Sequence, residues 1–124
     1  MANTAAIAAT WVDTLSLRGE LPFAQLLSEH FSHASITRLC DCGCNSFDCH
    51  VKGTGLAPLL GSVGSVSSIE VAFESNCGEP IDVTVRTDDR GLLSGMDVHL
   101  GLSNHGAMPA GVRLGKLLFT TPSL

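Results

Sequence analysis

Hydrophobic positions follow a helical period in the first part of the chain. Ile7, Trp11 and Leu15 recur every four residues, and several alanines lie between them. This spacing puts one apolar stripe along a helix, and alanine favours the helical state. The pattern predicts a helix over residues 4–17, with Gly19 as its stop.

A second helical pattern follows Pro22, which suits the first turn of a helix because its missing N–H needs no partner there. Apolar or aromatic side chains then recur at helical spacing at Phe23, Leu26, Leu27, His30 and Phe31. We expect this helix to end near His33, with His30 packed on its buried face. Two such helices need a surface to cover.

The period changes to two after the second helix, as is typical of antiparallel strands with one buried face. The pattern predicts strands over residues 35–40, 46–52, 68–74, 81–86 and 96–100. Glycine-rich residues 53–68 and 101–111 predict loops. The apolar residues of 112–119 should pack on the domain or on a partner.

These elements predict a single α+β domain over residues 1–124. Two N-terminal helices pack on a mainly antiparallel sheet, a meander of about five strands. The length suits one domain with its own core, and no linker or internal repeat divides the chain.

A cysteine-rich stretch lies where the helices give way to strands. Thiolates at these positions could hold Zn²⁺: Cys40, Cys42, Cys44 and Cys49, with His50 or Cys77 as an alternative fourth ligand. The spacing Cys-x-Cys-x-Cys-x₄-Cys differs from the paired cysteines of common zinc sites. The other interpretation is a glycine-centred turn between paired strands, with Cys40 and Cys49 as small buried hydrophobes. No other cofactor is expected.

Enzymatic chemistry has weaker support in the sequence. A thiol-redox enzyme lacks its Cys-x-x-Cys motif, and a serine hydrolase lacks Gly-x-Ser-x-Gly. Neighbouring strands could place Asp97 and His99 beside Asp82 or Glu70, as an acid–base pair requires. A solvated sheet face accounts for the same pattern.

The net negative charge of the chain indicates which classes of partner are disfavoured. The chain has seven Lys and Arg against twelve Asp and Glu, a formal net charge of −5, with the basic residues scattered. This composition disfavours binding to nucleic acid and to anionic membranes. The start of the chain lacks the basic region of a signal peptide, and no apolar run reaches the ~18 residues of a membrane span. We expect a cytoplasmic protein with reduced thiols.

Two motifs resemble a family of small bacterial proteins of uncharacterised function. The similarity spans roughly residues 20–100, and this chain departs from the family at His99 and in its glycine-rich close. The residues that carry it are Cys40, Cys42, Gly43, Cys44, Ser46 and Phe47, then Asp89, Gly91, Leu93, Ser94, Met96 and Val98. The resemblance implies a small α+β fold and bacterial origin, and no activity.

The sequence therefore predicts a non-enzymatic binding or accessory protein, whose partner is another protein or a second copy of the chain. A zinc-binding domain is the alternative, and a thiol-redox or hydrolytic enzyme comes third.

Overall fold

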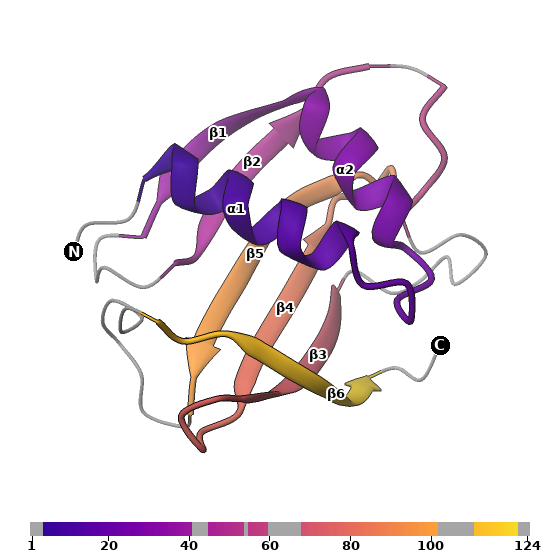
Figure 1. Ribbon diagram of the computed structural model, residues 1–124. Helices are drawn as coiled ribbons and strands as arrows, with labels where there is room; N and C mark the ends of the chain where they lie inside the picture. Colours follow the sequence, from indigo (N-terminus) through magenta and orange to yellow (C-terminus); the bar gives the residue numbers. More distant parts are fainter. Residues whose placement is uncertain (1–3, 41–44, 54, 60–67, 102–110, 122–124) are drawn as a thin grey trace.

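Two helices cover one face of a six-stranded antiparallel sheet (Figure 1). The computed structural model describes residues 4–40, 45–53, 55–59, 68–101 and 111–121. The predicted α+β class is confirmed, with one strand more than expected. No helix in these ranges is long and apolar enough to cross a membrane.

The helices form where their apolar periodicity predicts them. Helix α1 (Ala5–Ser16) begins at Thr4, whose hydroxyl oxygen accepts a hydrogen bond from the Ile7 N–H at 3.2 Å and so caps the first turn. Helix α2 (Ala24–Ser32) starts two residues later than the proline predicts. Both helices contribute buried residues to the core cluster that the sheet also lines.

The sheet has the strand order β1-β2-β5-β4-β3-β6. The strands are β1 (Ala34–Leu39), β2 (Phe47–Val51), β3 (Ser68–Ser75), β4 (Ile81–Thr87), β5 (Leu93–Leu100) and β6 (Leu114–Thr121). Only β3, β4 and β5 form the expected meander, because β2 pairs with β5 instead of β3. The connection over residues 52–67 exceeds the roughly two to five residues of a hairpin, so it can carry the chain across the sheet.

Strand β6 is the element that the period-two pattern missed. It pairs with β3, but the register shifts twice, between Ala72 and Phe73 and again between Phe73 and Ser75. Such bulges put extra residues into one strand and break the alternation of apolar and polar positions. The expectation that the apolar end of the chain packs back on the domain is confirmed for Leu114 and Leu117, which contact the core.

The core lies between the helices and the inner face of the sheet. Phe31 of α2 meets Phe47 of β2 edge-on, with ring centroids 5.9 Å apart. Strands β2 and β4 alternate buried residues with more exposed ones throughout, as predicted, whereas β3 and β5 also bury Ala72 and Gly95 on the opposite face. The inner-face residues are Phe47, Cys49, Val51, Ile69, Val71, Phe73, Ile81, Val83, Val85, Met96 and Val98. The opposite face, called the outer face below, carries the alternate residues.

Arg18 ties the corner between the helices to β6. Its Nη2 donates a 2.6 Å hydrogen bond to the Gly115 carbonyl oxygen, and its guanidinium lies 4.9 Å from the centre of the Phe73 ring. A cation this close to an aromatic ring is attracted by the electrons of the ring face. The contact holds an edge strand against the helical layer.

Candidate functional site on the outer face of the sheet

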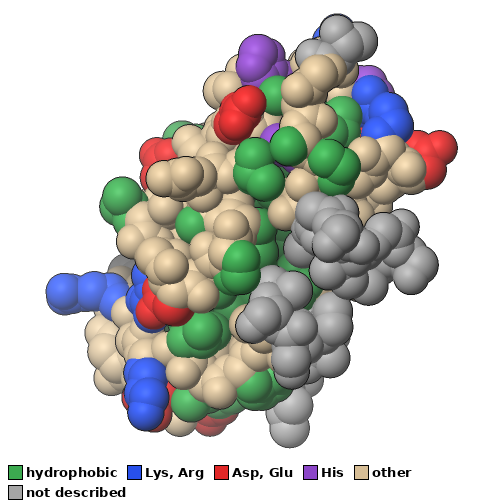
Figure 2. All heavy atoms as spheres, turned by 90° about the vertical axis from the view of Figure 1, so that its right-hand side faces the viewer, with side chains coloured by type: hydrophobic (Ala, Val, Ile, Leu, Met, Phe, Trp, Pro, Cys, Tyr) green, Lys and Arg blue, Asp and Glu red, His purple; other side chains and the backbone are tan. Residues whose placement is uncertain are grey.

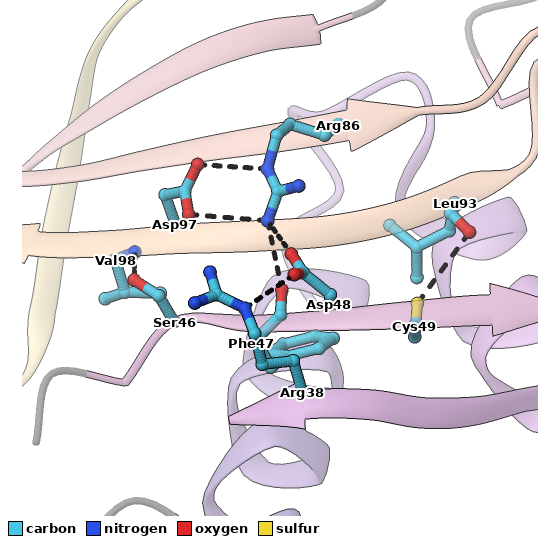
Figure 3. Close-up of polar contacts among 9 residues, drawn as sticks. All are labelled: Arg38, Ser46, Phe47, Asp48, Cys49, Arg86, Leu93, Asp97 and Val98. Carbon is cyan, nitrogen blue, oxygen red and sulfur yellow. Dashed lines mark hydrogen bonds and ion pairs between the residues drawn. The ribbon is translucent and has the colours of Figure 1, made fainter. Parts of the chain in front are cut away.

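One half of the outer face is neutralised by a row of alternating charges, shown in Figure 3. We call the residues of this row, Arg38, Asp48, Arg86 and Asp97, the paired half. Arg38 Nε donates to Asp48 Oδ2 at 2.9 Å, and Arg86 Nη2 donates to Asp48 Oδ1 at 2.6 Å. Arg86 Nε also donates to Asp97 Oδ2 at 3.0 Å. The row contains two cations and two carboxylates, so its charges cancel.

Gly95 makes this row possible. Arg86 lies on β4 and Asp48 on β2, with β5 between them, so the guanidinium has to cross β5. It does so directly over Gly95, where a Cβ atom would overlap Arg86 Nη2 and lie 2.7 Å from the Phe47 carbonyl oxygen. Nη2 also donates to that carbonyl oxygen at 3.2 Å (Figure 3). A glycine is therefore required where two strands and a guanidinium meet.

The Arg86 guanidinium holds the pKa of the Asp48 carboxyl below its usual range through its hydrogen bond. Burial acts in the opposite direction, and Arg38 adds a smaller lowering. The ionised form of Asp48 is thus stabilised by folding. Because the side chains of Asp48 and Arg86 are 28% and 32% exposed, solvent screens this pair only in part.

The other half of the outer face carries carboxylates with no cation of their own. Ala72 of β3 lies opposite Asp82 of β4 on one side and Phe119 of β6 on the other. Glu70 and Glu74 are two residues before and after Ala72 on the same strand, so they share its face. We call these five residues the unpaired patch. Cross-strand neighbours in a sheet lie roughly 5 Å apart, and alternate residues of one strand roughly 7 Å apart.

Exposure and bonding distinguish the unpaired patch from the paired half. Within the described ranges, the side chains of Glu70, Glu74 and Asp82 take part in no ion pair or hydrogen bond. Phe119 is 52% exposed, whereas Ala72 beneath it is 2% exposed. The patch is therefore a small apolar floor with an aromatic ring beside it and carboxylates around it.

The structure brings together part of the predicted acid–base arrangement. His99 lies directly opposite Asp82, but Asp97 lies opposite Thr84 and its carboxylate is bound to Arg86. A carboxylate held by a guanidinium is a poor proton acceptor, because ion pairing favours its ionised form. The four polar residues of this prediction occupy neighbouring rows of the sheet without converging on one point.

Two of the predicted zinc ligands lie in the described ranges at the cysteine turn. The Cys40 N–H donates to the Ser46 carbonyl oxygen at 3.1 Å, and Cys49 lies three residues further along β2, roughly 10 Å away. Cys49 Sγ approaches the Leu93 carbonyl oxygen at 3.7 Å (Figure 3). Burial raises the pKa of the Cys49 thiol to about 11. The structure therefore does not bring Cys40 and Cys49 together.

Of the remaining predicted ligands, His50 and Cys77 lie on different elements, in β2 and in the turn between β3 and β4. Cys42 and Cys44 are outside the described residues, and His50 is exposed opposite Ser35 of β1. Among the residues that are described, no group of three or more His, Cys, Asp or Glu could hold a metal ion. Zinc binding at the cysteine turn stays a prediction.

Cys77 is exposed in the turn between β3 and β4. Its sulfur lies 3.1 Å from the Ser75 hydroxyl oxygen, and this hydrogen bond lowers the pKa of the thiol. Ser75 in turn donates to the Glu79 carbonyl oxygen. Thiolate reactivity is therefore greater at Cys77 than at Cys49, although Cys77 lies on a different element from Cys40 and Cys49.

His30 is a buried structural residue, as its place on the apolar helix face predicts. It is 0% exposed, and its Nδ1 accepts a 3.1 Å hydrogen bond from the Leu93 N–H. Nε2 therefore carries the ring proton and donates it to the Ala57 carbonyl oxygen at 2.8 Å. Helix α2, β5 and the segment before β3 are joined by one neutral imidazole.

The bridge from Arg86 to Asp48 was not predicted from the sequence. A signal for it existed in Gly95, a glycine inside an otherwise regular strand, which marks a bulge or a close approach of other atoms. Nothing in the pattern, however, indicated that β2 would lie beside β5, so the identity of the approaching group could not be inferred.

Comparisons of the chain with protein-family models, with curated proteins and with solved structures give no match. The resemblance to small bacterial proteins stays a prediction. Evidence on function therefore comes from the chemistry of the surface. Figure 2 shows one face of the molecule, where the few Lys and Arg side chains stand apart from one another among polar and hydrophobic atoms.

Proposed function

We propose that this protein is a non-enzymatic binding protein that recognises a partner protein with the outer face of its sheet, around Phe119. The supporting observation is the exposure of two adjacent large apolar side chains, Leu118 at 46% and Phe119 at 52%, in a strand whose Leu114 and Leu117 pack against the core. Exposed aromatic residues on a rigid sheet are typical anchors of protein–protein interfaces.

The partner contacts side chains, because the sheet edges are unsuited to added strands. Both edge strands are bulged, β1 between Ile36 and Arg38 and β6 at its two register shifts. Bulges and exposed cations twist and block an edge, and Arg38 and Lys116 are exposed on these strands. Strand addition, including pairing of two copies through β6, is therefore disfavoured.

Site-specific photocrosslinking tests the proposal. The photoreactive amino acid p-benzoylphenylalanine replaces Phe119 in one variant and Gln25, exposed on α2, in a matched control. We expect a discrete covalent adduct in the native cells from position 119 and none from position 25, because only the former lies on the binding surface. An adduct of twice the protein mass would identify self-association.

Two results would contradict the proposal. One is the absence of an adduct from position 119 and also from position 118. The other is the same set of adducts from the Gln25 control, which would indicate random collision instead of binding.

A further inference from the structure

The chemistry of the unpaired patch specifies the partner. We propose that the patch binds an extended polypeptide segment of another protein that presents Lys or Arg side chains at alternate positions. This inference rests on the proposed binding function and adds the charge and shape of the segment that is bound.

Charge complementarity is the first argument. Three carboxylates, Glu70, Glu74 and Asp82, surround Ala72 on one face and form no ion pair with a described Lys or Arg. Glu70 and Glu74 each lie diagonally across from Asp82, roughly 7 Å away, so the three negative charges repel each other weakly in the free protein. A cationic partner removes that repulsion on binding, and electrostatic complementarity of this kind also raises the association rate.

The contrast with other acidic residues strengthens this argument. Asp48 and Asp97 are bound by Arg86, Asp88 by Arg90, and Glu20 by Arg18. Arginines are thus available in the fold and are placed beside carboxylates elsewhere. Among the acidic residues described on the outer face, those of the patch form no ion pair, so they can bind an external cation.

The exposed aromatic ring is the second argument. Phe119 lies directly across from Ala72, so its half-exposed ring borders the carboxylates. A guanidinium or ammonium group is attracted to an aromatic face within about 6 Å of its centre. An aromatic ring beside carboxylates provides both the apolar and the ionic contact of a Lys or Arg side chain, whose stem is apolar and whose tip is charged.

Spacing identifies the partner as a chain and not a single ion. Glu70 and Glu74 are four residues apart on β3, or roughly 13 Å, which one metal ion cannot bridge. Alternate side chains of an extended polypeptide lie on one face roughly 7 Å apart, which matches the distance from Ala72 to either glutamate. Two or three successive cationic side chains of such a segment can each meet one carboxylate.

An NMR titration of the ¹⁵N-labelled full chain tests the inference. The probe is a synthetic peptide of alternating arginine and threonine, and the comparison peptide alternates glutamate and threonine. We expect the cationic peptide to shift amide signals around Ala72, Asp82 and Phe119, and the acidic peptide to shift none of them. The double variant Glu70→Gln with Asp82→Asn should bind the cationic peptide about tenfold more weakly, which corresponds to about 1.4 kcal/mol for the two lost ionic contacts together.

The matched control removes the same charge from the opposite side of the molecule. Asp13 on α1 and Glu29 on α2 are exposed, and the Asp13→Asn with Glu29→Gln variant has the same net charge as the patch variant. We expect the control to keep its affinity within about twofold, because exposed charges beyond a Debye length of ~10 Å are screened. Equal weakening in both variants would overturn the inference, since it would show attraction to the overall charge of −5.

Further outcomes separate this inference from the proposed function. Spermidine binding as tightly as the peptide would overturn the assignment to a polypeptide. Failure of the cationic peptide to bind, together with an adduct from a crosslinker at position 119, would refute the cationic partner and leave the binding function standing. Loss of the adduct as well would refute both.

Discussion

The paired half and the unpaired patch lie on the same face of the same sheet, yet the carboxylates of the first form ion pairs and those of the second form none among the described residues. Arg86 binds Asp97 on the neighbouring strand β5 and crosses that strand to bind Asp48 on β2. Glu70, Glu74 and Asp82 have no such cation in the described structure. Both sets appear in the sequence as the polar positions of alternating strands.

This difference indicates that the two halves of the outer face have different roles. The paired half joins β4, β5 and β2 at the point where the chain order departs from a meander, so it stabilises the topology. The unpaired patch lies over β3, β4 and β6, where the strands pair regularly or with bulges and need no side-chain bridge. Charge without a structural partner is then available for binding.

Gly95→Ala should have the largest effect on stability. Its Cβ atom would overlap Arg86 Nη2 and lie 2.7 Å from the Phe47 carbonyl oxygen, so β2 and β5 have to separate or Arg86 has to leave. We expect the free energy of unfolding in urea to fall by about 3 kcal/mol, the upper range for overpacked sites. A loss below about 0.5 kcal/mol would show that the position tolerates a side chain, as an ordinary surface site does.

Arg86→Met comes next, with an expected loss of about 2 kcal/mol, because two carboxylates lose a charged hydrogen-bond donor in a partly buried setting. Equilibrium urea unfolding measures it. The double variant Arg86→Met with Gly95→Ala should lose less stability than the sum of the two single losses. The methionine removes the guanidinium that the new Cβ atom would overlap. Strictly additive losses would contradict the proposed contact over Gly95.

The ion pairs of Asp48 should make the stability of the protein depend on pH in the acid range. Arg86 lowers the folded-state pKa of Asp48, while an unfolded aspartate titrates near ~4. The contribution of Asp48 is therefore complete above that unfolded value and is lost as the pH falls through the lower folded value. We expect unfolding free energies measured from pH 6 to 2 to fall more steeply in the native protein than in Asp48→Asn. Parallel profiles would contradict the assignment.

Phe119→Ser should have the smallest effect on stability of these changes. The ring is 52% exposed, so its removal exposes little that was buried, and we expect a change within about 1 kcal/mol. Thermal unfolding followed by circular dichroism measures it. A larger loss would show that Phe119 belongs to the core and would remove the anchor of the proposed interface.

The fold class and five of the six strands could be predicted because their apolar period is local. Phe47 and Cys49, or Ile81 and Val83, mark an inner face without knowledge of their neighbours. Strand β6 could not be predicted, because its two bulges against β3 break the period. The pairing of β2 with β5 was also out of reach, because strand order depends on contacts between distant residues.

The sequence predicted which residues lie on the face of the candidate site, but not which of them form ion pairs. Alternation put Asp82, Asp97 and His99 on the outer face correctly. Which carboxylate meets a cation depends on Arg86 reaching over Gly95 to Asp48, 38 residues away in sequence, and no local pattern carries that information.

Urea unfolding of Asp48→Asn beside Asp82→Asn is the most direct test of this division of the outer face. Both changes remove one carboxylate charge from the same face while keeping the shape of the side chain. We predict that Asp48→Asn loses about 2 kcal/mol, because it removes the negative charge shared by Arg86 and Arg38 and one of the two acceptor oxygens, and that Asp82→Asn stays within about 0.5 kcal/mol. Equal losses in the two variants would contradict the account.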